Sequence, residues 1–279
     1  MHAFHNTGPK GEVFVKPGAR SREDFFREYL EKTPIAMAFW RSMECHRFSK
    51  EKLDHPVLDV GCGDGFLARV AFGGNLEAGI DLDPQEVERA VASGSYKKAI
   101  CASATELPFK AKTFKTVISN CVLEHIPDID ATLKEINRVL KPKGRLMITV
   151  PSECFSNNSF FRTVLSAVGL SGLGKWYVDK LNQTFKHFHV DDRKTWEKRM
   201  KKAGLKVVTA DYIIPLKTFH TYERWMILAF PSKILKKLFG RWVIGPRGPV
   251  KWFAANWLRQ SLNADGGPGA CYFIVARKG

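Results

Sequence analysis

The sequence predicts an α/β fold in which a doubly wound parallel sheet is covered by helices on both faces. An apolar strand at 56–60 runs directly into a turn that carries three glycines spaced two residues apart. An acidic residue, Asp81, ends the next short apolar segment. Strand-like and helix-like segments then alternate up to residue 151, a pattern that favours parallel strands joined by helices.

Two helices are predicted ahead of the sheet. Residues 1–22 form a basic arm with Gly and Pro and little periodicity. Ser21, followed by Glu23 and Asp24, has the composition of a helix N-cap with an acidic first turn. A second helix is expected over 34–48, where apolar residues recur among charged ones.

Five strands are predicted next, near 56–60, 76–81, 97–101, 115–120 and 145–150. Lys-Pro-Lys-Gly at 141–144 ends a helix of about 130–140 and starts the fifth strand. After residue 151 we expect an insertion at 152–190, a helix from 192 to 203 that stops at Gly204, and a strand at 206–214. A final strand is expected at 271–276, after a second insertion at 215–270. With 279 residues, the chain has the length of one enlarged domain.

The glycine turn at 61–65 indicates a site where a ligand lies against backbone, because glycine has no Cβ and tolerates positive φ. A carboxylate at Asp81 can accept hydrogen bonds from the hydroxyls of a ribose. A nicotinamide fingerprint would need its third glycine where Phe66 stands. The run from Val57 to Gly65 instead resembles motif I of the class I S-adenosylmethionine (SAM)-dependent methyltransferases. The segments 79–84, 103–109, 114–126 and 133–151 resemble the family's next motifs in the same order, and the chain is similar to the type 11 methyltransferase-like family.

The resemblance implies a Rossmann-like sheet of seven strands in the order 3-2-1-4-5-7-6, with helical insertions after strands 5 and 6. Residues 1–50 would then supply an arm and helices over the cofactor site, and 51–279 would form the methyltransferase domain. Because ligands bind beyond the carboxyl ends of parallel strands, both insertions are expected over the substrate mouth.

By the same resemblance the cofactor is SAM. Asp59 and the backbone of the glycine turn would hold its methionine part, Asp81 its ribose and Leu82 its adenine, and the Asn120 carbonyl would receive its amino group. The family often has an acidic residue at the position of Ser103, so here the backbone of this loop would serve. The cofactor residues expected are Asp59, Gly61, Cys62, Gly63, Gly65, Asp81, Leu82, Ser103, Ala104 and Asn120.

His125 is the candidate general base, because it follows the fourth strand and an imidazole titrates near neutral pH. The alternative is that Glu124-His125 forms a structural corner without a chemical role. Glu124, His187 and His189 are the candidate contacts to the methyl acceptor. No metal site is expected, because no carboxylate cluster accompanies these histidines and the six cysteines lack ligand spacing.

The positive charge is concentrated in the second half of the chain. Residues 1–150 carry 22 Lys/Arg and 20 Asp/Glu, a net of +2, whereas 151–279 carry 22 and 8, a net of +14. Residues 224–264 contain no acid, eight Lys/Arg and seven Phe/Trp, and 231–242 has the pattern of a basic amphipathic helix. Such a helix is typical of an anionic membrane surface, but it can also pack on its own domain.

Nucleic acid is not the expected partner. The aromatic residues follow helical spacing and form no stacking platform. In addition, Asn120-Cys121-Val122-Leu123 replaces the Asn/Asp-Pro-Pro-aromatic tetrad usual in enzymes that methylate base amines.

The sequence therefore predicts a SAM-dependent methyltransferase. Its expected acceptor is a lipid, a lipid-linked glycan or a quinone-like molecule, with O-methylation favoured. No secretory signal or membrane span is seen, and the expected location is cytoplasmic and peripheral at the membrane. A soluble small-molecule methyltransferase with a lidded pocket and a non-catalytic SAM-binding protein remain as alternatives.

Overall fold

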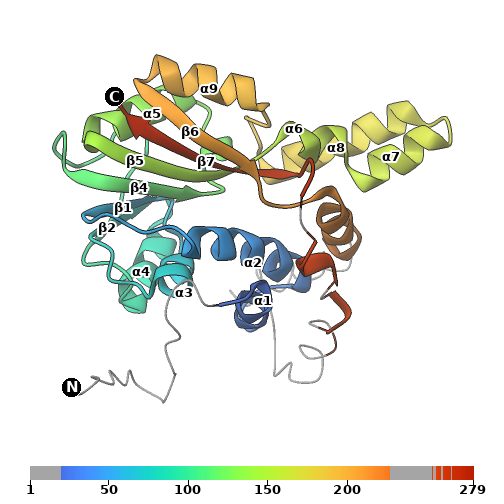
Figure 1. Cartoon of the computed structure of the whole chain (residues 1–279), viewed down its shortest axis with the longest axis horizontal. Helices are drawn as coiled ribbons and strands as arrows, with labels where there is room; N and C mark the ends of the chain where they lie inside the picture. Colours follow the sequence, from blue (N-terminus) through green and yellow to red (C-terminus); the bar gives the residue numbers. More distant parts are fainter. Residues whose placement is uncertain (1–19, 227–252, 254–255, 259, 265) are drawn as a thin grey trace.

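The computed structural model describes residues 20–226, 253, 256–258, 260–264 and 266–279. The predicted basic arm up to residue 19 and the predicted amphipathic helix at 231–242 lie outside the described residues. Within the described part, a seven-stranded sheet has the order β3-β2-β1-β4-β5-β7-β6 (Figure 1). The predicted fold class and strand order are both confirmed.

The first five strands run parallel, and β7 lies antiparallel between β5 and β6. The carboxyl ends of β1, β2 and β4 therefore meet at one edge of the sheet, where ligands bind in such folds. β5 begins earlier than predicted and includes the turn at 141–144, in which Lys143 has a φ of 63°. The strands are β1 (Val57–Val60), β2 (Ala78–Asp81), β3 (Ala99–Cys101), β4 (Phe114–Asn120), β5 (Leu140–Pro151), β6 (Leu205–Tyr212) and β7 (Cys271–Lys278).

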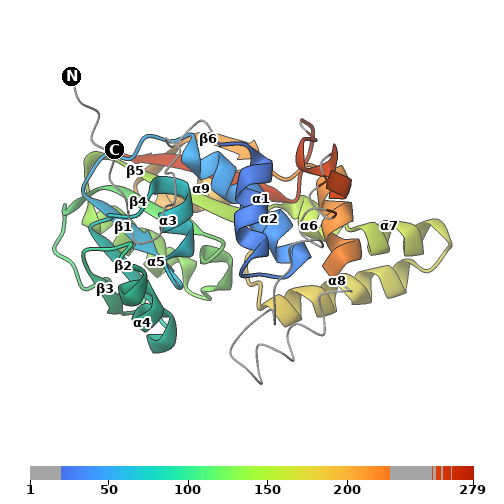
Figure 2. The ribbon, with the colours of Figure 1, turned by 90° about the horizontal axis from the view of Figure 1, so that it is seen from below.

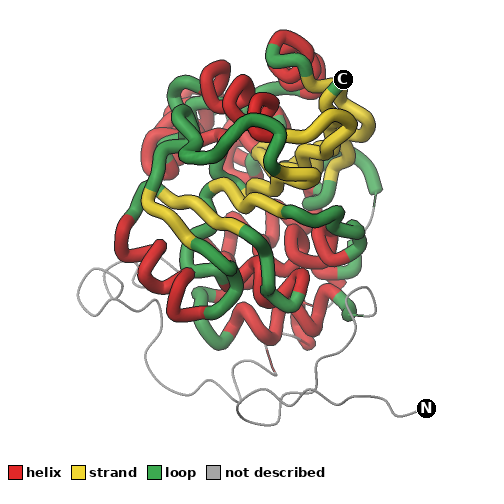
Figure 3. The backbone as a smooth tube through the Cα atoms, turned by 90° about the vertical axis from the view of Figure 1, so that its left-hand side faces the viewer, coloured by secondary structure: helices red, strands yellow, loops and turns green. Residues whose placement is uncertain are grey.

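Helices cover both faces of the sheet, as Figure 3 shows from the side. The helices α1 (Arg22–Leu30), α2 (Ile35–Ser49), α3 (Phe66–Phe72) and α4 (Pro84–Ser93) cover one face (Figure 2). The helices α5 (Ile129–Val139) and α9 (Arg193–Lys202) cover the other. Successive residues of β7 point to opposite faces of the sheet and pack in different clusters. Phe273 packs with α1 to α3, and Ile274 packs with α5 and α9.

Local signals in the sequence explain where these helices begin and end. The Ser21 side chain accepts from the backbone N–H of Asp24, whose carboxylate in turn accepts from the Ser21 N–H, and this capping box starts α1. Asp192 caps α9, and Gly204 follows with a left-handed φ of 80°. The predicted start of the first helix and the predicted end of the helix before Gly204 are thus confirmed.

The segment after β5 forms three helices, α6 (Glu153–Asn157), α7 (Phe160–Ala167) and α8 (Ser171–Phe185). α7 and α8 form a hairpin that extends away from the sheet (Figure 1). It leaves several large apolar side chains exposed, namely Val164, Val168, Leu170, Leu173 and Trp176. No helix of the described residues has the length and apolar character that a membrane span requires.

Candidate active site

The three glycines of the turn between β1 and α3 have different surroundings. A Cβ on Gly61 would stand 2.3 Å from Cγ2 of Val122, and one on Gly65 would stand 2.6 Å from the Ser93 hydroxyl. All three glycines have left-handed φ values, but no described atom lies within 4 Å of a Cβ built on Gly63. At positions 61 and 65 a side chain would collide with neighbouring residues of the protein, so glycine is required there by the fold. Gly63 instead borders open space in which a ligand could lie.

Four backbone N–H groups of this turn are already used by the fold. Gly61 and Cys62 both donate to the Ile80 carbonyl at 2.8 Å, and Gly65 donates to the Cys62 carbonyl at 3.0 Å. The Gly63 N–H donates to an Asp81 carboxylate oxygen at 2.9 Å. The turn can therefore offer carbonyl oxygens to a ligand, and these suit the ammonium end of an amino acid better than a phosphate.

Asp59 lies buried directly before the turn, with 2% of its surface exposed. It accepts a hydrogen bond of 2.7 Å from the Tyr96 hydroxyl. Burial raises the pKa of Asp59 to about 7, against the opposing effect of that hydrogen bond. Tyr96 was not predicted as a site residue; it belongs to the loop before β3, and its contact with Asp59 is visible only once β1 and β2 are paired.

The adenosine side of the predicted site lies beyond β2. The Asp81 carboxylate is oriented by the N–H groups of Gly63 and Asp83, at 2.9 and 3.0 Å. Leu82 next to it is 74% exposed, which is high for leucine and leaves an apolar surface that a planar base could cover. In the following loop the Ser103 hydroxyl lies 2.7 Å from that of Thr105. Ser103 and Ala104 are both half-buried at this edge.

The carboxyl end of β4 is fixed by side-chain hydrogen bonds. The Thr149 hydroxyl of β5 donates to the Asn120 side-chain oxygen at 2.7 Å and accepts from the Cys121 N–H at 3.0 Å. This fixes the end of β4, so that the next residues form the short 3-10 helix η1 (Leu123–His125). Cys121 itself has a left-handed φ of 49°.

Glu124, His125 and His187 come together beside this strand end. The Glu124 carboxylate is 1% exposed and lies 3.8 Å from Nε2 of His125. The His125 and His187 rings are 5.2 Å apart between centroids. His187 follows α8, so the first insertion supplies one of the three groups. His189 is separate: it is buried, and its Nε2 lies 3.0 Å from the Ile126 carbonyl. This contact holds the loop after η1 in place, and the roles of His187 and His189 toward the acceptor stay predictions.

The pKa values of the three clustered groups differ from their ordinary values. Burial raises the pKa of Glu124 to about 8. Burial, with a smaller contribution from the charge of His125, lowers the pKa of His187 to about 4. Burial also lowers the pKa of His125, although its hydrogen bond to the Lys186 carbonyl opposes the shift. Both imidazoles are therefore neutral near pH 7.

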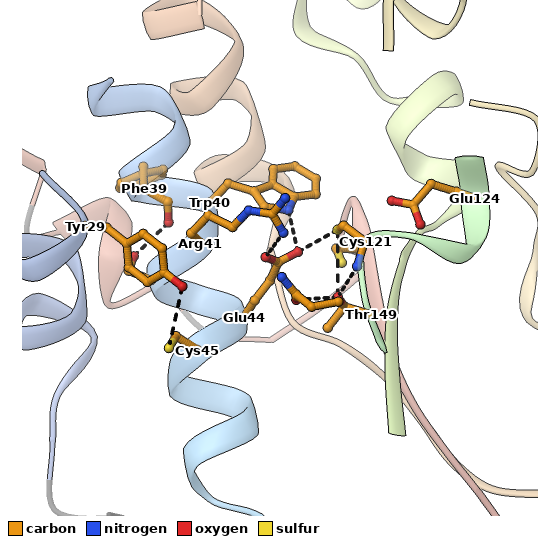
Figure 4. A network of polar contacts seen from close by, with 12 residues as sticks. Tyr29, Phe39, Trp40, Arg41, Glu44, Cys45, Cys121, Glu124 and Thr149 are labelled. Atoms are coloured by element: carbon orange, nitrogen blue, oxygen red, sulfur yellow. Dashed lines mark hydrogen bonds and ion pairs between the residues drawn. The ribbon is translucent and has the colours of Figure 1, made fainter. Parts of the chain in front are cut away.

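A buried polar network joins α2 to the same strand end (Figure 4). Glu44 is fully buried and accepts hydrogen bonds from Trp40 Nε1 at 2.7 Å and Arg41 at 2.8 Å. The Cys121 thiol also reaches Glu44, at 2.7 Å. The sequence showed Arg41 and Glu44 only as charged residues within a helix. Their role in connecting α2 with β4 depends on tertiary contacts that the sequence pattern does not contain.

A family model described as a methyltransferase domain matches residues 36–210, more than half of the chain. The chain belongs to this family. The strand order, the glycine turn and the acidic residue at the end of β2 place it among the class I SAM-dependent methyltransferases, whose cofactor is SAM.

The curated relatives include methyltransferases of several acceptors. The chain is 33% identical over 118 residues to the sterol 4-C-methyltransferase of Caenorhabditis elegans, covering 39% of this chain and 35% of the relative. It is 35% identical over 144 residues to the demethylmenaquinone methyltransferase of Symbiobacterium thermophilum, covering 48% and 57%. It is 28% identical over 134 residues to the ubiquinone biosynthesis O-methyltransferase of Rhizobium leguminosarum bv. trifolii, covering 44% and 53%. The match therefore spans between about a third and just over half of the length of these relatives.

Among solved structures, a SAM-dependent methyltransferase from Thermotoga maritima superposes with a TM-score of 0.55 at 19% identity. The superposition covers 92% of this chain and 97% of the other. At this identity the likeness supports the fold alone.

Proposed function

We propose that this methyltransferase transfers the methyl group of SAM to an oxygen atom of an amphipathic acceptor at a membrane surface. The observation that carries this proposal is the cluster of Glu124, His125 and His187 beside the end of β4, at the sheet edge where the glycine turn follows β1. Methyl transfer is an in-line displacement in which the acceptor oxygen attacks the methyl carbon and the carbon–sulfur bond breaks. S-adenosylhomocysteine leaves with the electron pair, and the acceptor must lose its proton.

The cofactor would lie along the turn from Asp59 to Gly65, with its ammonium group toward the backbone carbonyls. Asp81 would accept from the ribose hydroxyls, because its two oxygens are already oriented by Gly63 and Asp83. The exposed Leu82 would cover one face of the adenine. The methyl group would then point past the end of β4 toward the cluster.

A membrane-associated acceptor is supported by two features of the insertions. The α7–α8 hairpin exposes five large apolar side chains, and residues 160–178 carry two basic residues and no acidic one. Phe253 and Trp257 in the second insertion are each 63% exposed. Apolar side chains with Trp and flanking positive charge are typical of proteins that bind the interface of an anionic membrane. The named relatives that act on sterols and quinone precursors fit the same acceptor class.

The test is transfer of a labelled methyl group from SAM to a total lipid extract. We expect label in the organic phase that is stable to mild acid and base, as an ether would be. Asp81→Asn keeps an acceptor for the Gly63 N–H but loses one carboxylate oxygen. It should weaken SAM binding by roughly 10- to 100-fold, the loss that a hydrogen bond to a charged group causes.

Glu88→Gln is the matched control, because Glu88 is exposed on α4 and its loss changes the charge equally. Label confined to aqueous metabolites would favour the soluble small-molecule methyltransferase. Tight SAM binding with no transfer to any fraction would favour the non-catalytic SAM-binding protein.

A further inference from the structure

The cluster beside the end of β4 has the composition of a metal site. The ligand-type atoms of Glu124, His125 and His187 all lie within 4.8 Å of one another. Two of the residues come from η1 and the third follows α8, so the site forms only when the first insertion packs against the sheet edge. The Phe188 N–H donates to the Glu124 carbonyl at 2.8 Å and fixes this packing.

Each histidine of the cluster has one ring nitrogen held by an oxygen. Nδ1 of His125 lies 3.3 Å from the Lys186 carbonyl, and Nδ1 of His187 lies 3.1 Å from the Asn182 side-chain oxygen. If each Nδ1 carries the proton, each Nε2 presents a lone pair. A second hydrogen bond of this kind is what orients histidines that bind metals.

The Glu124 carboxyl group is only partly satisfied by hydrogen bonds. Its Oε2 is buried and has no hydrogen-bond partner among the described residues. The nearby positive charge of Arg41 is 2.8 Å from Glu44 and is balanced by it (Figure 4). A buried carboxylate oxygen without a partner is costly, and a bound cation would remove that cost.

We propose that Glu124, His125 and His187 bind one divalent first-row transition metal ion, with zinc as the representative case. Two imidazoles and one carboxylate are the ligands of open zinc sites, which leave a position for water or substrate. The nitrogen donors disfavour magnesium and calcium, which prefer oxygen ligands. The site departs from the expectation that the chain has no metal, because the sequence separates His187 from Glu124 by more than sixty positions.

The metal would act on the acceptor hydroxyl, an assignment that rests on the proposed function. The coordinated hydroxyl loses its proton to bulk water at lower pH than the free alcohol does, since the cation stabilises the oxyanion. The oxyanion then attacks the methyl carbon of SAM, and the sulfur retains the electron pair of the broken bond. In this arrangement His125 is a ligand and does not serve as the general base.

The test uses Co²⁺ added to the full chain after treatment with a chelator. Binding to nitrogen and oxygen ligands gives visible d–d absorption without the near-ultraviolet charge-transfer band that a thiolate produces. We expect one Co²⁺ per chain, displaced by Zn²⁺ but not by Mg²⁺. Glu124→Gln and His187→Gln should each weaken binding at least tenfold, on the scale of ligand-site losses. His220→Gln should bind as wild type does, because its Nε2 contacts the Asn158 carbonyl elsewhere.

Two controls keep the result interpretable. Glu44, Cys121 and Cys271 form a second group of potential ligands, so Cys121→Ser must leave the Co²⁺ spectrum unchanged. Retained SAM binding shows that each variant is folded. Absence of stoichiometric binding, or equal binding by the Glu124 and His187 variants, would overturn the metal site.

The metal site and the proposed function can fail separately. Metal binding without methyl transfer to any lipid would support the metal site and contradict the proposed acceptor class. Methyl transfer that continues after chelation, with no metal bound, would support the proposed function. His125 would then be the general base that accepts the proton of the acceptor.

Discussion

Asp59 is a carboxyl group whose environment couples folding to pH. It is buried beneath the glycine turn and hydrogen-bonded to Tyr96, and its pKa rises from 3.8 to about 7. Between those values the folded state holds the proton and the unfolded state has released it. Its contribution to stability is therefore complete below pH 3.8 and is lost as the pH rises through about 7.

The first prediction at this scale concerns Asp59→Asn, which keeps the hydrogen bond from Tyr96. At 1.36 kcal/mol per pKa unit, the wild-type chain should lose on the order of 4 kcal/mol relative to the variant from below pH 3.8 to above pH 7, and about 3 kcal/mol of this loss falls between pH 5 and pH 8. Urea denaturation at several values between about pH 5 and pH 8 measures this difference. Other groups titrate in both proteins, so their effects cancel. Parallel stability curves would show that the pKa of Asp59 is not raised.

Some residues of the candidate site could be predicted from the sequence, and others could not. The glycine turn and Asp81 were predictable because each stands at the end of a strand that the sequence itself marks, within a short local motif. Tyr96 and Glu44 could not be predicted, since their partners lie 37 and 77 positions away in the chain. The same holds for His187, whose approach to His125 depends on how the first insertion packs.

At the scale of elements, the helices and strands of the sheet were predictable because each has its own capping or apolar pattern. The boundaries of α1 and α9 follow from Ser21, Asp192 and Gly204. The first insertion was recognised only as an interruption. α7 buries none of its residues, and a sequence pattern alone could not show that this helix extends away from the sheet.

The hairpin of α7 and α8 gives a prediction of its own. Replacing Val168, Leu170 and Leu173 by Asp removes three exposed apolar side chains from its tip. Each contributes about 1 to 2 kcal/mol when it enters an apolar phase, so the triple variant should bind lipid vesicles at least roughly tenfold more weakly. Vesicle co-sedimentation measures this.

Val91→Asp together with Val208→Asp is the matched control for the hairpin variant. Both side chains are more than half exposed, and they lie on α4 and β6, outside the hairpin. Unchanged vesicle binding in the hairpin variant, or an equal loss in the control, would remove the hairpin as a membrane contact.

The whole molecule divides into an almost neutral first half and a strongly basic second half, with net charges of +2 and +14. This asymmetry predicts that binding to anionic vesicles weakens as salt is added. Surface charges are screened over about 10 Å at 0.1 M salt and about 3 Å at 1 M. Reversing the charge of four basic residues should weaken binding to anionic vesicles as added salt does. These residues are Lys233, Lys236, Lys237 and Arg241. Co-sedimentation with neutral vesicles is the control, and equal binding to both vesicle types would contradict an electrostatic contribution.

The origin of His187 has a consequence for engineering. Every residue assigned to the cofactor lies between Asp59 and Asn120, whereas His187 comes from a separate segment after β5. The segment that supplies His187 can therefore be exchanged without redesigning the part that handles the methyl donor, while Glu124 and His125 stay with the sheet. Grafting residues 152–190 from a relative onto this sheet would be a direct way to give one donor-binding scaffold a new acceptor range.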